Sequence, residues 1–482
     1  MSSLKTQVLS SFLWSAIQKI GALIVSFFTN LVLARILSPD DFGNIGILLI
    51  FIVVCQAFVD GGFGAALIQR KGVSDADYST VFYWNLFVAA MLVIIIYFVA
   101  PIIGTYYKSE LLCNLLRVQS LTIFINAFSL VQTAKLTKEL NFKVLSVRSI
   151  ISVTVGASIA VMLAYNGWGV WSLVIKEIVS ATVGVLLLWL FCKWYPSLVF
   201  DKQSFKEMFQ FGFLILISSI VDTVYRNIQS LIIGKVFSFR DLGYYTQARK
   251  MEEIPVQGGT MVLTQVLFPV YSSLAGQYEY MKSIVRKNVI IITFLTFPVM
   301  ILLILLASPL LTILFTNKWA ASIPLFQILC IEGMFFPLNC ANTEIFKAIG
   351  KSSIYFILQT VKRVVSLVII IYSVQYGLYP MMWTVAITGI LFYIVNVIFT
   401  HRIFGYKMRE QLIDIMPNLV LSIIIGLFIF ILLIIANISN GYMLILFGSC
   451  TYMSLYLFFS IILKFKGVKL MWNIIKNELI YF

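Results

Sequence analysis

Long apolar stretches separated by short polar connections run through the whole chain. The stretches 91–100 and 419–436 are apolar almost throughout and lack the period-two alternation of barrel strands. A helix needs about 20 mostly apolar residues to cross a bilayer, where its backbone must be hydrogen-bonded internally. The pattern predicts an all-α polytopic membrane protein with about fourteen transmembrane helices. The expected spans are 8–36, 42–66, 79–104, 111–134, 146–165, 168–192, 207–236, 241–271, 284–316, 320–346, 353–375, 379–400, 411–436 and 441–463.

Composition supports a bilayer as the solvent of this chain. Hydrophobic residues make up 61% of the sequence and charged residues only 11%, whereas soluble domains carry roughly 25% charged residues. The sequence shows no nucleotide-binding loop, no metal-ligand spacing among its six cysteines and single histidine, and no triad-like set. We therefore expect neither a cofactor nor a metal, and an enzyme is not favoured.

The charge of +15 follows the predicted loops. Alternate loops divide into a strongly basic set and a poorly basic set, and the positive-inside rule places the basic set in the cytoplasm. Both termini are then cytoplasmic, and no nucleic-acid partner is implied. The opposite set holds only Arg35, Lys108, Lys235, Arg240 and Lys318. The basic set carries Lys5, Arg70, Lys71, Lys135, Lys138, Lys143, Arg148, Lys193, Lys202, Lys206, Lys282, Arg286, Lys287, Lys347, Lys351, Arg402, Lys407, Arg409, Lys464, Lys466, Lys469 and Lys476.

A segment near the start of the chain is repeated 200 residues later. The sequence LVLARILSPDDFG at 31–43 aligns without gaps on LIIGKVFSFRDLG at 231–243. Six predicted spans separate the copies, which predicts a parallel repeat of the kind known in alternating-access transporters. The expected division is an N-lobe at 1–195, a C-lobe at 196–403, and a C-terminal part at 404–482. This last part comprises two spans and a basic tail, which is either an amphipathic helix on the cytoplasmic leaflet or disordered.

Ionisable residues inside the predicted spans are candidates for function, because charges in a bilayer are costly. Lys19, Arg226, Arg249 and Lys250 are expected to line a central cavity and to bind an anionic substrate. The alternatives are ion pairs between helices and side chains that snorkel to an interface. Asp222–Arg226 and Arg249–Glu253 have the spacing of pairs on one helix face, whereas Lys176 and Glu177 are expected to point apart. The candidates for cation coupling are Asp222, Glu252 and Glu253.

The other charged residues inside the predicted spans leave two interpretations open. For Arg117, near the predicted outer face, snorkelling is favoured; Lys362 and Arg363 fit a cavity or a structural role equally. In the sequence Asp60-Gly61-Gly62, the glycines permit either a local helix break or close helix contact, and close contact is favoured.

Several segments resemble polysaccharide exporters of the Wzx/WzxC type. ARILSPDDFG at 34–43 is similar to the first outer loop of that family, and DGGFGAALIQR at 60–70 to the end of its second span. The segments 242–245, 266–271 and 318–325 follow in the family's order, although Gly61-Gly62 departs from the more frequent Leu-Gly. The motif residues are Arg35, Asp41, Gly43, Asp60, Gly61, Gly62, Lys235, Asp241 and Gly243.

The resemblance implies the fold of the multidrug/oligosaccharidyl-lipid/polysaccharide (MOP) exporters, with two six-helix lobes in a V around a cavity lined by spans one, two, seven and eight. The implied substrate is an undecaprenyl-pyrophosphate-linked repeat unit, flipped across the bacterial inner membrane. Because the sequence has no nucleotide-binding site, a gradient of H⁺ or Na⁺ is the expected source of energy. A polysaccharide polymerase and a chain-length regulator are the implied protein partners, alongside membrane lipids. The rivals are a MATE-like drug/cation antiporter, an exporter of the peptidoglycan precursor, a membrane polymerase or ligase, and a channel.

Overall fold

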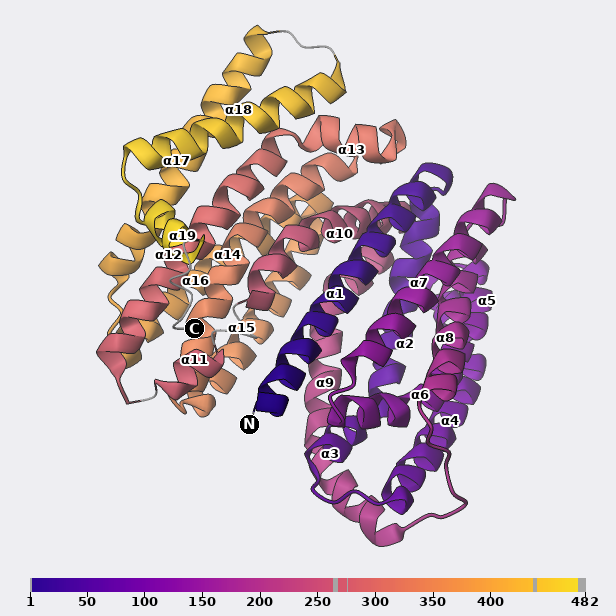
Figure 1. The fold of residues 1–482 in the computed structure, drawn as a ribbon. Coiled ribbons are helices and arrows are strands. Elements are labelled where there is room, and N and C mark those ends of the chain that lie inside the picture. The colour runs from indigo at the N-terminus through magenta and orange to yellow at the C-terminus, as the bar shows by residue number, and fades with distance from the viewer. Residues whose placement is uncertain (1, 263–267, 275, 437–439, 476–482) are drawn as a thin grey trace. The chain divides into compact units, whose positions relative to one another are not determined.

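The computed structural model describes residues 2–262, 268–274, 276–436 and 440–475. Nearly all of these residues are helical, and no strand occurs among them, so the predicted all-α fold is confirmed (Figure 1). Within the described part of the chain, thirteen helices are long and apolar enough to cross a membrane. The chain is therefore a multi-pass membrane protein.

The first part of the chain forms nine helices whose positions follow the predicted spans. The short helices α3 and α5 are separated from α2 and α6 by breaks within the second and fourth predicted spans. The helices are α1 (Ser2–Ile36), α2 (Pro39–Asp60), α3 (Phe63–Gln69), α4 (Asp75–Tyr107), α5 (Glu110–Gln119), α6 (Leu121–Lys138), α7 (Phe142–Tyr165), α8 (Trp171–Phe191) and α9 (Lys202–Val236).

The second part continues in the same way, with two short 3₁₀ turns between helices. Its α-helices are α10 (Phe239–Val262), α11 (Phe268–Ser273), α12 (Tyr278–Leu305), α13 (Ala307–Phe315), α14 (Ser322–Ala348), α15 (Ser352–Ser373), α16 (Leu378–Phe404), α17 (Met408–Ile435), α18 (Gly441–Ile462) and α19 (Lys466–Ile475). The 3₁₀ turns are η2 (Asn317–Trp319) and η3 (Val374–Tyr376).

The eighth predicted span, 241–271, corresponds to α10 and α11. It is not among the thirteen apolar helices, and α10 carries a cluster of charged residues between 249 and 253. The residues 263–267, which also belong to the predicted motif at 266–271, lie outside the described part of the chain. The total of fourteen spans thus stays a prediction.

Contacts divide the chain into two compact units, Met1–Gly243 and Tyr244–Phe482. In the first unit, α1 and α8 both pack against α7, and α2 packs against α9 (Figure 1). In the second unit, α12 packs against α17 and α14 against α16. The three-part division inferred from the repeat stays a prediction.

An aromatic core stabilises the first unit near the ends of α3, α4 and α8. Phe63, Phe82 and Trp194 are almost fully buried in one cluster, and the rings of Phe82 and Trp194 meet edge to face. Trp194 lies in the connection between α8 and α9, which is thereby packed onto the bundle. Burial of side chains this large contributes most of the packing energy available to such a segment.

The glycine pair after Asp60 both breaks a helix and permits close packing. Gly61 and Gly62 have φ angles of 56° and 75°, so α2 ends there and α3 begins at Phe63. A Cβ atom on Gly62 would strike the backbone carbonyl of Gly212 on α9. The sequence favoured packing over a break, and the structure contains both.

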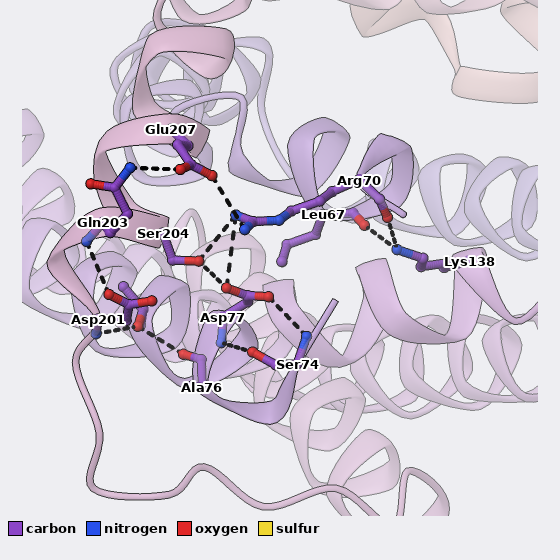
Figure 2. Close-up of polar contacts among 11 residues, drawn as sticks. Leu67, Arg70, Ser74, Ala76, Asp77, Lys138, Asp201, Gln203, Ser204 and Glu207 are labelled. Atoms are coloured by element: carbon purple, nitrogen blue, oxygen red, sulfur yellow. Dashed lines mark hydrogen bonds and ion pairs between the residues drawn. The ribbon is translucent and has the colours of Figure 1, made fainter. Parts of the chain in front are cut away.

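A polar network ties the beginning of α9 to the loop between α3 and α4 (Figure 2). Ser204 donates a short hydrogen bond to Asp77, and the Arg70 guanidinium donates to Ser204 at 3.0 Å. Arg70 also pairs with Glu207 at 3.3 Å and with Asp77 at 3.8 Å. The side chain of Asp77 is buried, so these partners compensate its desolvation.

The C-terminal tail forms an amphipathic helix over the residues that are described. Val468 and Met471 of α19 pack against a buried cluster that includes Phe294 of α12, while Lys469 and Trp472 are exposed. Residues 476–482 lie outside the described part of the chain. The leaflet against which α19 lies stays a prediction.

Candidate functional site

An exposed ion pair lies near the middle of α9. Arg226 donates from Nε to a carboxylate oxygen of Asp222 at 2.6 Å, as the four-residue spacing predicted. The Arg226 side chain is 72% exposed and that of Asp222 34%. Next to the pair, a shallow hollow is lined by Leu214, Ile215, Ser218, Ser219 and Asp222.

Lys19 has a similar setting on α1. It lies about midway along this helix, and its side chain is exposed. Charged groups exposed at this depth of a membrane-spanning helix are costly in lipid and are usually found facing a water-filled cavity. Lys19, Asp222 and Arg226 therefore have the exposure that a polar cavity wall requires.

Arg249 lies instead in a cluster of three carboxylates. Its guanidinium is 3.0 Å from Glu332 of α14, 3.4 Å from Glu252 and 3.6 Å from Glu253. The Glu252 side chain is only 2% exposed, and a Cβ on Gly333 of α14 would strike its carboxylate. The glycine thus makes room for a buried acid, and the cluster has more negative than positive charge.

Glu332 is the member of this cluster for which the sequence predicted neither a partner nor a role. The predicted Arg249–Glu253 pair is present, but Glu332 approaches Arg249 more closely from a helix 83 residues away. No local spacing rule relates residues so far apart. The neighbouring Lys250 is exposed.

The repeated motif residues form helix caps at two corresponding positions. Asp41 accepts a hydrogen bond from the Ser38 hydroxyl at 2.7 Å, and Ser38 accepts one from the Asp41 backbone at 3.3 Å. Ser238 and Asp241 repeat both bonds, at 2.7 and 3.0 Å. This reciprocal pattern fixes the first turns of α2 and α10.

The basic residues of the motif flank these caps. Arg35 is exposed at the end of α1. Lys235, at the end of α9, donates to the Tyr106 carbonyl at 2.5 Å, and its ammonium lies 3.6 Å from the centre of the Tyr106 ring. These contacts indicate a role in holding the helix ends.

The other charged candidates have local partners. Arg117 lies over the Tyr97 ring at 4.4 Å and donates to the Tyr97 carbonyl. Buried Lys362 donates a short hydrogen bond to Asn396 of α16. The expectation that Lys176 and Glu177 point apart is wrong, because their side chains pair at 2.9 Å. Long flexible stems let adjacent residues on a helix bend toward each other.

The part of the chain that the structure describes contains no group of three His, Cys, Asp or Glu side chains able to hold a metal ion. The exposed charges of α1 and α9 and the acid-rich cluster around Arg249 suit binding and release of charged species. The fold is similar to that of the lipid II flippase MurJ, with a TM-score of 0.76 at 16% identity, covering 94% of this chain and 98% of that one. It is also similar to an inward-facing MATE transporter of the MOP superfamily, with a TM-score of 0.62.

The chain belongs to the family described as Polysaccharide biosynthesis protein, which it matches over residues 32–324. It is 26% identical to the teichuronic acid biosynthesis protein TuaB of Bacillus subtilis (strain 168) over 74% of each chain. It is 23% identical to the lipopolysaccharide biosynthesis protein WzxC of Escherichia coli (strain K12), over 69% of this chain and 68% of that one. The predicted relationship to the Wzx/WzxC type is thus confirmed.

Proposed function

We propose that the chain is a flippase for a lipid-linked oligosaccharide. It moves an undecaprenyl-pyrophosphate-linked repeat unit from the cytoplasmic to the outer leaflet of the bacterial inner membrane by alternating access. The family supports a role in polysaccharide biosynthesis. Relatives named for teichuronic acid and lipopolysaccharide synthesis, and the fold of a lipid II flippase, support a substrate that combines sugar with a lipid carrier.

The exposed Arg226–Asp222 pair on α9 is the observation that carries this proposal. A pyrophosphate needs cationic partners, because an unpaired charge costs several kcal/mol to desolvate. An arginine guanidinium can bind phosphate oxygens with two parallel hydrogen bonds. Arg226 would exchange Asp222 for the incoming pyrophosphate, and Lys19 would add a second positive charge from α1.

The cluster around Arg249 supplies a candidate for coupling to a cation gradient. Three carboxylates surround one guanidinium, so the cluster can take up a further positive charge. Glu252 and Glu253, which the sequence singled out, and Glu332 would take up H⁺ in one state of the cycle and release it in another. The energy of the gradient would then drive translocation, since no nucleotide-binding motif is present in the sequence.

The distribution of lipid-linked repeat units between the two leaflets, measured in a strain that lacks the gene, tests this function. Lipid-linked repeat units are quantified on the inner and outer leaflets, and surface polysaccharide is measured in the same cells. We expect repeat units to accumulate on the inner leaflet, and the wild-type gene to restore both leaflet distribution and polysaccharide. Normal outer-leaflet delivery in a strain without another exporter would contradict the proposal.

A drug/cation antiporter is the second candidate, favoured by the acid-rich cluster. Such a protein binds organic cations, which three carboxylates around one arginine would attract. Drug susceptibility and efflux of a fluorescent cation in the same deletion strain distinguish the two functions. Restored efflux with unchanged leaflet distribution would establish the antiporter.

A further inference from the structure

The two copies of the repeated motif lie against each other within residues 1–243. A Cβ on Gly43 would strike the backbone carbonyl of Phe239, and a Cβ on Gly243 would strike the backbone carbonyl of Pro39. Gly43 and Gly243 are equivalent in the repeat, as are Pro39 and Phe239. Each copy therefore presents the same surface to the other, as the two subunits of a symmetric dimer do.

At one position of the repeat, the residues of the two copies lie directly opposite each other across this contact. The Arg240 guanidinium donates to the Asp40 carboxylate at 3.0 Å, and the two residues are separated by the repeat length of 200. Like charges at such a position would repel each other. The two copies differ here, and the difference makes an ion pair.

The contact brings the backbones together without intervening side chains. At Gly43 and Gly243 even a methyl group would collide with the backbone of the other copy of the motif. The Tyr107 and Phe239 rings, with centroids 6.5 Å apart, add a contact with the end of α4. No sugar ring can pass between α2 and the start of α10 while these backbones touch.

We infer that this reciprocal contact, which we call the outer clasp (Pro39, Asp40, Gly43, Phe239, Arg240 and Gly243), is a gate that separates in each transport cycle. The inference rests on the proposed function, because only a transporter has to open at this end. The loops concerned belong to the set predicted to face outward. The glycines allow a tight closed state, and the Arg240–Asp40 ion pair across it is exposed to solvent, where such a pair contributes little to holding the closed state.

Crosslinking the clasp tests the inference. Asp40→Cys and Arg240→Cys are combined in a background in which all six native cysteines are replaced, and the pair is joined by oxidation or by a short bifunctional maleimide. Export is measured as leaflet distribution in cells that carry this variant. We expect export to fall to the level of the deletion strain when the pair is joined, and to recover when a disulfide is reduced.

The matched control is a second cysteine pair in the same unit. Ser79→Cys and Ser197→Cys join two residues whose hydroxyls lie 3.0 Å apart, where α4 meets the connection before α9. Crosslinking this pair is expected to leave export unchanged. Equal loss in both crosslinked variants, or full export with the clasp pair joined, would overturn the inference.

Charge reversal provides a test that does not depend on crosslinking. Asp40→Arg and Arg240→Asp each place like charges together and should hold the clasp apart, which lowers export several-fold. The double reversal restores the ion pair and should restore export. Lack of rescue would count against the clasp. If the wild type moves no lipid-linked sugar in the deletion strain, the proposed function fails, whereas a wild type that flips with a crosslinked clasp overturns the gate alone.

Discussion

At the scale of single residues, the arginines of the helices differ in how exposed they are and in how many carboxylates surround them. Arg249 is held by three carboxylates, and one of them, Glu252, is buried. Arg226 has one carboxylate neighbour on its own helix and is largely exposed. The first arrangement stabilises helix packing and can respond to a cation, whereas the second leaves donors free for an anionic ligand.

Replacing Arg226 should weaken substrate binding without harming the fold. Arg226→Ala removes an exposed side chain, and we expect export to fall by about 30-fold, since losing one partner of a desolvated ion pair costs ~2 kcal/mol or more. Leaflet distribution and the amount of membrane-inserted protein are measured together. Arg117→Ala, which removes an arginine packed on Tyr97, is the control and should retain export. Full export by Arg226→Ala would exclude Arg226 from the substrate site.

The Arg249 cluster should show strong energetic coupling. Arg249→Met leaves three carboxylates without their cation, and we expect a loss of about 2 kcal/mol in stability because of mutual repulsion and unpaired burial. Adding Glu332→Gln removes one of the acids and should recover part of the loss. Thermal unfolding of purified protein in nanodiscs measures both variants. Strictly additive effects would show that Arg249 and Glu332 do not interact.

At the scale of elements, glycines determine where α2 and α9 touch. Gly62→Ala should lower stability by about 2 kcal/mol or more, because a Cβ there meets the Gly212 backbone as well as an unfavourable φ. Gly72→Ala has a similar φ of +69° but open space around it, so it should cost only about 1 kcal/mol. The difference in melting temperature between the two variants isolates the collision. Equal melting temperatures would mean that α2 and α9 are further apart.

Elements were predictable where the signal is local. Apolar runs placed the helices because each run is long enough to cross lipid, and the predicted limits differ mainly at the ends, where polar caps add a turn. The capping box of Ser74 and Asp77, for example, starts α4 at Asp75, ahead of the predicted residue 79.

Contacts between distant segments could not be read from the same signal. Glu332 beside Arg249, Gly212 beside Gly62, and Arg240 beside Asp40 all depend on how helices are placed in three dimensions. The repeat showed that 31–43 and 231–243 are alike, but likeness does not imply contact. Of the site, the sequence therefore predicted the charged residues and the pairs within one helix, and missed the partners from other helices.

At the scale of the whole molecule, the charge of the loops fixes the expected orientation. Lys71 lies in a loop of the basic set and Asn317 in a loop of the opposite set, and both are exposed. In a cysteine-free background, Asn317→Cys should react with a membrane-impermeant maleimide in intact cells, and Lys71→Cys only after permeabilisation. The reverse pattern would place both termini outside and invert the proposed direction of transport.

The Asp40–Arg240 pair also has a consequence for how such a chain can arise by gene duplication. In a homodimer of identical half-length chains, the residue equivalent to Asp40 and Arg240 would be the same on both sides of the contact. An acid would then meet an acid, or a base would meet a base. Joining the copies in one gene removes that restriction, because each half can then mutate without the other. An ion pair between equivalent positions at a two-fold axis can therefore form in a fused pseudo-dimer but not in a homodimer.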